Sequence, residues 1–184
     1  MEWYMYLAVI AAGLIAGFIN TLAGSGSLLT LPLLMFLGLP ANIANATNRI
    51  GVLVQSLVGS WSFKRQKIYT FRESLWMAIP AMAGSVAGSV VAVHINEHIM
   101  RLLIGGLLVF MFFVILYRPE HWVREHAVQI TRARRVWVAI IFFFIGIYGG
   151  FIQAGVGFFL LAALVLGAGM GLTKANALKV VIVA

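Results

Sequence analysis

The feature that most constrains this chain is the absence of charge from two long apolar stretches. Residues 3–48 contain no Asp, Glu, Lys or Arg, and neither do residues 136–173. Each stretch is long enough for about two membrane crossings, since one crossing takes roughly 20 residues. Only 10% of the chain is charged and 62% is hydrophobic, whereas about a quarter of the residues in a soluble domain are charged. The sequence therefore predicts an all-α, polytopic transmembrane helical bundle.

Eight apolar segments are expected in or at the membrane. Four tryptophans stand at predicted segment ends, where their rings prefer the headgroup region: Trp3, Trp61, Trp76 and Trp137. Gly84 and Gly88 have the G-x-x-x-G spacing that allows close helix packing. The last segment is too short to cross, and truncation of the chain is favoured over completion by a partner. The approximate segment bounds are 4–22, 25–38, 43–62, 75–95, 99–117, 136–154, 156–170 and 174–184.

Two segments inside the uncharged stretches are also too short to cross roughly 30 Å of hydrocarbon. Residues 27–37 follow the Gly-Ser-Gly cluster at 24–26, and residues 158–167 follow the Gly-Val-Gly cluster at 155–157. Irregular backbone at membrane depth is tolerated only where it is buried in protein or lines a cavity. Both places are therefore predicted to be broken or re-entrant helices.

The two clusters belong to an internal repeat with an offset of 131 positions. Apolar matches are weak evidence in a membrane protein, but glycines and a polar triplet that match in one register are a strong signal. The matched features are Gly24 with Gly155, Gly26 with Gly157, Gly38 with Gly169, and Ala-Asn-Ala at 44–46 with Ala-Asn-Ala at 175–177.

The number of passes between the two copies predicts their relative orientation. Five passes separate the first segment from the one that begins near residue 136, and an odd number inverts the second copy. We therefore expect two inverted repeats. Residues 1–117 would form the first, with about five helices that include a short broken one. Residues 118–135 would form a basic cytoplasmic loop, and residues 136–184 an incomplete second repeat.

The basic residues predict the topology. The formal net charge of +8 would suggest a nucleic-acid partner in a soluble protein, but here the charge is concentrated in loops 64–73 and 118–135. Under the positive-inside rule both loops face the cytoplasm, next to anionic lipid headgroups. The N-terminus then lies outside. We expect a multi-pass protein of a bacterial inner membrane, with the lipid bilayer and no nucleic acid as a partner, and a homo-oligomer stays open.

Inverted repeats with broken helices at matching positions are typical of secondary transporters. A helix that begins at a break presents unsatisfied N–H donors and a partial positive charge, which suits an anion. The sequence thus predicts a transporter of a small anion that works by alternating access. The alternative is a non-transporting membrane partner or scaffold, or an inactive fragment of a transporter.

The motifs that carry these breaks also carry a family resemblance. The segments "AGFINTLAGSGSLLTLPLLMFLGLPANIANATNR" and "GGFIQAGVGFFLLAALVLGAGMGLTKANALKVV" resemble the TauE/SafE family of membrane transporters, the sulfite exporters. The chain departs from the family at Ser27 and Phe158, where a third glycine is common, and it has no second-copy equivalent of Pro32. The resemblance implies a substrate among sulfite, organosulfonates and related sulfur oxyanions.

The candidate substrate-binding residues surround the two breaks. Arg49 is either a functional charge inside the membrane or a snorkelling side chain. The serines could donate to an oxyanion or to backbone carbonyls freed by the break, and the paired asparagines could bind substrate or act structurally. Lys174 and Lys179 are expected to snorkel. The full candidate set is Gly24, Ser25, Gly26, Ser27, Asn45, Thr47, Asn48, Arg49, Gln153, Gly155, Gly157 and Asn176.

Catalysis, metal binding and cofactor binding are not expected. The chain has no cysteine, which excludes thiolate chemistry. His94 and His98 have metal-ligand spacing, but apart from Glu97 no further ligand stands near them. Ser25 could pair with His94 as an intramembrane hydrolase would require, yet the second break has no serine, so we predict that the chain is not an enzyme.

Overall fold

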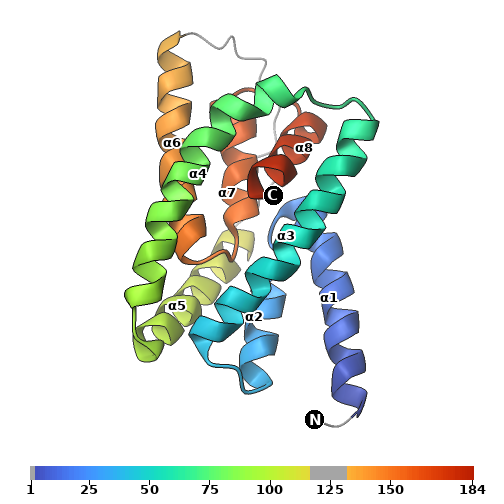
Figure 1. The fold of residues 1–184 in the computed structure, drawn as a ribbon, viewed down its shortest axis with the longest axis vertical. Helices are drawn as coiled ribbons and strands as arrows, with labels where there is room; N and C mark the ends of the chain where they lie inside the picture. The colour runs from blue at the N-terminus through green and yellow to red at the C-terminus, as the bar shows by residue number, and fades with distance from the viewer. Residues whose placement is uncertain (1–2, 117–131) are drawn as a thin grey trace.

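The computed structural model describes residues 3–116 and 132–184, and this part of the chain is all-helical (Figure 1). Most of the predicted basic loop at 118–135 lies outside the described residues. The eight α-helices and one π-helical turn of the described residues are α1 (Trp3–Ala23), α2 (Ser27–Phe36), α3 (Ala41–Arg65), α4 (Phe71–His94), α5 (Glu97–Leu116), α6 (Arg132–Phe151), α7 (Val156–Ala162), η2 (Ala163–Gly167) and α8 (Leu172–Val183).

Helix length and composition indicate a multi-pass membrane protein. Three described segments are long and apolar enough to cross a bilayer, namely Ser74–His94, Glu97–Val114 and Arg134–Phe151. Large apolar side chains are widely exposed on the helices, with Phe36 reaching 89% exposure, as expected of a surface that faces lipid. The two short segments predicted from the glycine clusters are confirmed as short apolar helices, Ser27–Phe36 and Val156–Gly167.

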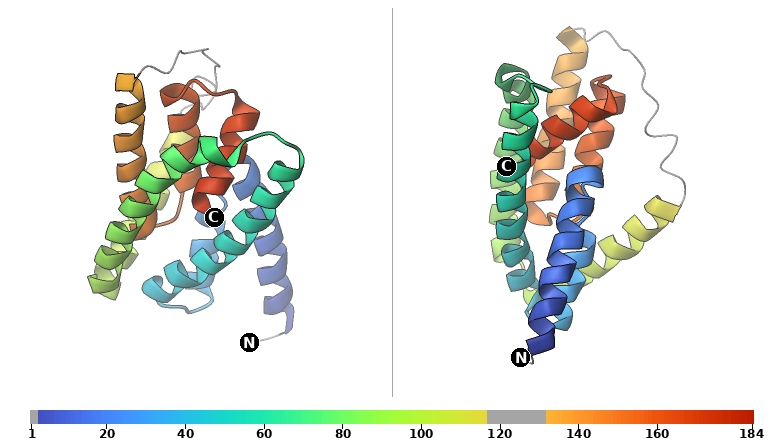
Figure 2. Two further views of the ribbon diagram at one scale, coloured as in Figure 1. Left: turned by 45° about the horizontal axis from the view of Figure 1, so that its top comes forward. Right: turned by 90° about the vertical axis from the view of Figure 1, so that its right-hand side faces the viewer.

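The helices that follow or precede the two breaks differ in direction between the N-terminal and C-terminal parts of the chain. α1 and α3 run from the end of the molecule near the N-terminus toward the other end, whereas α6 and α8 run back (Figure 1). The left view of Figure 2 shows α1 and α6 on different sides of the molecule. The short helices α2 and α7 each reverse the direction of the helix before them.

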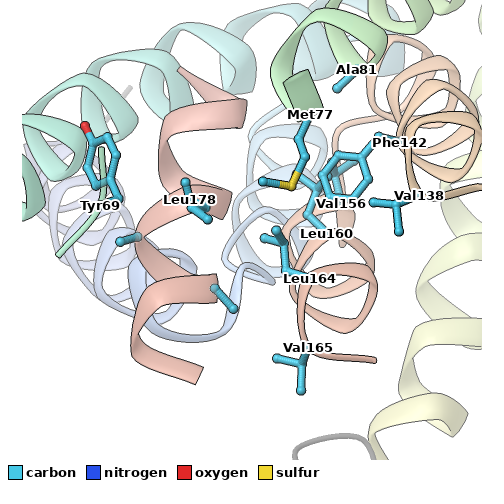
Figure 3. Packing of buried hydrophobic residues seen from close by; sticks show 12 residues of the cluster. Tyr69, Met77, Ala81, Val138, Phe142, Val156, Leu160, Leu164, Val165 and Leu178 are labelled. Atoms are coloured by element: carbon cyan, nitrogen blue, oxygen red, sulfur yellow. The ribbon is translucent and has the colours of Figure 1, made fainter. Parts of the chain in front are cut away.

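Two apolar cores hold the bundle together. One core joins α4 with α6, α7 and α8, and Met77, Phe142 and Leu160 meet at its centre (Figure 3). The other core joins α2, α3 and α5 through Leu31, Ala44 and Ile104, all fully buried. In a soluble protein, burying one large apolar side chain stabilises the fold by about 1.5–3 kcal/mol. Lipid is as apolar as these side chains, so in a membrane the helices are held together mainly by close packing.

Close packing is most evident between α4 and α6, which form the most extensive helix pair of the bundle. A Cβ atom built on Gly84 would lie within 3.0 Å of the Phe143 carbonyl oxygen, and one built on Gly150 within 3.0 Å of the Ser85 carbonyl oxygen. Each helix thus lays glycines against the backbone of the other. The close approach predicted from the G-x-x-x-G spacing of α4 is confirmed.

The start of α3 is capped by a distant carboxylate. Pro40, the residue before α3, makes no side-chain cap. Instead the Glu97 carboxylate accepts hydrogen bonds from the backbone N–H groups of Ala41 (2.7 Å) and Asn42 (3.4 Å). A negative charge at a helix N-terminus satisfies orphan donors and interacts favourably with the helix dipole. Glu97 therefore fixes the first turn of α3 on the start of α5.

Replacing Glu97 with alanine is expected to lower the melting temperature of the detergent-solubilised protein by a few degrees, the scale of a lost helix cap. The matched control is Arg101→Ala, because Arg101 reaches the same carboxylate through an exposed ion pair of 3.1 Å and exposed pairs contribute little. Equal melting temperatures for Glu97→Ala and the wild type would contradict the capping role.

Candidate functional site

Each of the two helix breaks contains one glycine with left-handed backbone. α1 ends at Ala23 and Gly24 follows with φ +76°, while α6 ends at Phe151 and Gly155 follows with φ +74°. The turns after the short helices match as well, because Gly38 has φ +92° and Gly169 has φ +65°. Left-handed backbone is readily adopted only by glycine. All four glycines occupy the positions that the offset of 131 pairs.

The two breaks touch each other. A Cβ atom built on Gly24 would lie within 3.0 Å of the Gly157 backbone, and one built on Gly157 would meet the Gly24 backbone equally closely. The remaining space between the breaks has a volume of about 10 Å³. Since a water molecule needs about 10–15 Å³ measured in this way, an oxyanion does not fit there in this conformation. A ligand-sized space would need the breaks to separate.

A hydrogen-bonded cluster stands at the start of α2. The Asn48 amide nitrogen donates to Ser27 Oγ (3.0 Å), and Thr30 Oγ1 donates to Asn48 Oδ1 (2.5 Å). Ser27 and Asn48 are buried. Ser27 uses its oxygen as an acceptor in this cluster, so its own hydroxyl hydrogen is left to donate elsewhere.

Beside this cluster lies a large open groove between α1, α2 and α3. Its volume is about 960 Å³, within the range of small-molecule sites. Most of its lining is apolar, and its polar wall includes four of the predicted site residues, Gly26, Ser27, Thr47 and Asn48. Gln55 also lines the groove and bridges two α1 side chains, accepting from Asn20 (3.1 Å) and donating to Thr21 (2.8 Å).

Two other predicted site residues cap the helix that leads into the second break. Arg49 Nη2 donates to the carbonyl oxygens of Gly150 and Phe151, the latter at 3.1 Å. The Asn45 amide nitrogen donates to the Phe151 carbonyl oxygen as well (3.0 Å). These two carbonyls have no N–H donor within α6, because the last carbonyls of a helix are left unpaired. Side chains of α3 thus terminate α6.

The first break is capped in the same way from the other half of the chain. Lys179 Nζ donates to the carbonyl oxygens of Asn20 (3.1 Å) and Thr21 (3.0 Å) near the end of α1. Lys179 is only 2% exposed. The prediction that it snorkels to the interface is wrong, because α8 packs against α3 inside the bundle and the side chain finds acceptors there. A sequence signal existed, since the offset of 131 pairs Lys179 with Asn48.

The other predicted site residues are spread around the second break. Gln153 lines both the 10 Å³ space and a neighbouring cavity of about 80 Å³. Its Oε1 atom and the Oδ1 atom of Asn176 are buried without a hydrogen-bond partner in the described part of the chain. Gly155 lies against the Met111 side chain. Ser25 is partly exposed in the first break, and its carbonyl accepts from Leu28 N (3.0 Å).

No group of three metal-binding side chains exists among the described residues. His94 Nδ1 lies 2.7 Å from the Val90 carbonyl oxygen of its own helix. His98 is exposed.

Comparison with known proteins identifies the class of this chain. Residues 9–184 match the family described as sulfite exporter TauE/SafE. A probable membrane transporter protein, ORF9, of Sinorhizobium sp is 27% identical over 96% of this chain and 67% of its own length. A probable membrane transporter protein of Haemophilus influenzae is 27% identical over 93% of this chain and 67% of its own length.

A further relative is the probable membrane transporter protein YfcA of Escherichia coli K12, which is 29% identical over 89% of this chain and 60% of its own length. The chain thus spans about two thirds or less of the length of these relatives. No solved structure matches the fold significantly.

Proposed function

We propose, on the premise that this chain belongs to the sulfite exporter TauE/SafE family of membrane transporters, that it carries a small anion across the bilayer by alternating access. The proposed substrates are sulfite, organosulfonates and related sulfur oxyanions. The observation that carries the proposal is the meeting of two glycine-built helix breaks, Gly24 against Gly157, inside the bundle.

The two halves are proposed to be inverted repeats. Support comes from the paired left-handed glycines, which recur at the offset of 131, and from the opposite directions of α1 and α6 (Figure 1). Support also comes from the reciprocal caps, in which α3 terminates α6 and α8 terminates α1. In inverted-repeat transporters the substrate sits between such halves, and one half rocks against the other.

The anion is proposed to bind at the start of α2, where the groove meets the first break. The start of α2 carries the partial positive charge of the helix dipole, while the N–H groups of Leu28 and Leu29 already donate to the carbonyl oxygens of Ser25 and Gly26. Ser27, Thr47 and Asn48 offer hydroxyl and amide groups from the groove wall. When the breaks separate, Gln153 and the backbone of Gly155–Gly157 would complete the site from the other half.

The proposed topology places the basic ends of the helices in the cytoplasm and the N-terminus outside. The end of α3 and the start of α6 lie at the same end of the molecule (Figure 1). At this end Arg65 stacks over Trp61 (3.8 Å to the ring centre) and Arg135 over Trp76 (5.5 Å). Such cation–ring pairs suit the headgroup region, where amphipathic rings and basic side chains gather.

Transport of radiolabelled sulfite and methanesulfonate into liposomes that contain the purified protein tests the proposal. Ser27→Ala and Asn48→Ala are each expected to lower uptake at subsaturating substrate by about tenfold, because a hydrogen bond to a charged group contributes about 1.5–3 kcal/mol. Ser89→Ala is the control, since the Ser89 hydroxyl donates to Val86 O of its own helix (2.9 Å) and lines neither the groove nor the space between the breaks.

Two results would contradict the proposal. Flux of every tested anion at the level of empty liposomes would favour a non-transporting membrane partner. Normal flux in both Ser27→Ala and Asn48→Ala, with the protein folded, would remove the assignment of the site.

A further inference from the structure

We infer that Lys179 supplies the positive charge with which this transporter selects anions at the helix breaks. The inference rests on the proposed function and adds a residue outside the set predicted from the sequence. It gives Lys179 a second role beyond that of a cap on α1.

The position of Lys179 sets it apart from Arg49, which is only partly buried. Lys179 borders the 10 Å³ space between the breaks, together with Gly24, Gly157 and Gln153. Arg49 makes an equivalent cap on α6, but it lines neither the groove nor the 10 Å³ space between the breaks. The two cations therefore share a structural role and differ in access to the site.

The surroundings of Lys179 lack a compensating negative charge. Its ammonium group donates to two backbone carbonyls and forms no ion pair within the described residues. A buried charge is costly unless it is paired, and ionisable groups within membrane segments mark substrate pathways. An anion that enters between the breaks would supply the missing counter-charge.

The hydrogen bonds of Lys179 also leave capacity for a ligand. An ammonium group has three donors, and two of them reach Asn20 O and Thr21 O. The third can reach an oxyanion when the breaks separate, while the first two keep the side chain in place. The positive charge would thus stay at the first break while Gly157 and Gln153 move with the second.

Kinetics with Lys179→Gln and its matched control Arg49→Gln test this role. Lys179→Gln is expected to raise the KM for sulfite about tenfold or more, because it removes the charge and keeps a donor for the α1 carbonyls. Arg49→Gln is expected to lower the maximal rate or the yield of folded protein without raising the KM. Lys179→Arg keeps the charge and is expected to stay within a few fold of the wild-type KM. Lys179→Met replaces the Gln variant if that variant does not fold.

A second readout separates this inference from the proposed function. Sulfite is expected to raise the melting temperature of the wild-type protein in detergent, and Lys179→Gln is expected to lose this shift. Loss of the shift in a protein that shows no flux would support anion binding at Lys179 and overturn transport. An unchanged KM and shift in Lys179→Gln, or equal KM increases in Lys179→Gln and Arg49→Gln, would overturn the inference. Absence of both flux and shift in the wild type would overturn both.

Discussion

Replacing Gly24 with alanine is expected to abolish transport and to destabilise the protein by roughly 2–5 kcal/mol. Gly24 has φ +76°, and its added Cβ would lie within 3.0 Å of the Gly157 backbone. A backbone neighbour cannot turn aside as a side chain can, so the two breaks must move apart. The melting temperature in detergent should fall by roughly 2–4 °C for each kcal/mol lost, and sulfite uptake should fall to the level of empty liposomes.

Gly105→Ala is the matched control for this variant. Gly105 lies inside α5, and nothing stands within 4 Å of the Cβ position. Alanine favours a helix over glycine by about 0.5–1 kcal/mol, so this variant should melt at or slightly above the wild-type temperature. A Gly24→Ala protein with wild-type uptake and melting temperature would show that the breaks do not pack as described.

The double variant Gly84→Ala and Gly150→Ala is expected to separate α4 from α6. Each new methyl group would lie within 3.0 Å of a carbonyl oxygen of the facing helix. Overpacking costs about 1–3 kcal/mol at one site, and the two sites belong to one interface, so their effects need not add. We expect a lower melting temperature and a lower yield of monodisperse protein after size-exclusion chromatography.

This double variant should change stability without changing substrate affinity, unlike a variant of the binding site. Whatever protein folds should keep the wild-type KM for sulfite, because neither glycine lines the groove or the space between the breaks. Gly106→Ala serves as the control, since its Cβ position is open. A double variant as stable as this control would mean that α4 and α6 lie farther apart than the glycines suggest.

The helix breaks could be predicted from the sequence because glycine affects the backbone conformation at its own position. Gly24 and Gly155 interrupt uncharged stretches, and only a residue without Cβ readily adopts the left-handed conformation found there. The short helices and the suitability of α4 for close packing followed from similar local patterns, whereas its partner α6 did not. Periodicity, composition and spacing all act over a few residues, so a single sequence is enough to read them.

The caps and the contact between the breaks were not predictable in this way. Lys179 reaches Thr21 across 158 positions, and Glu97 reaches Ala41 across 56. A side chain's partner at such a distance depends on how the helices pack, which no local pattern records. For the same reason the sequence indicated two breaks, but not that Gly24 and Gly157 meet closely enough to leave almost no space.

The reciprocal caps have a consequence for the biogenesis of the protein. During synthesis α1 enters the membrane long before Lys179 has been made, because the ribosome must first add the 158 positions that separate Lys179 from Thr21. The Asn20 carbonyl already accepts from Gly24 N (2.9 Å), but until then the Thr21 carbonyl must be satisfied by water or by the insertion machinery, since an unpaired carbonyl in lipid costs several kcal/mol. The nascent first half is therefore an incomplete product that matures only when the second half arrives.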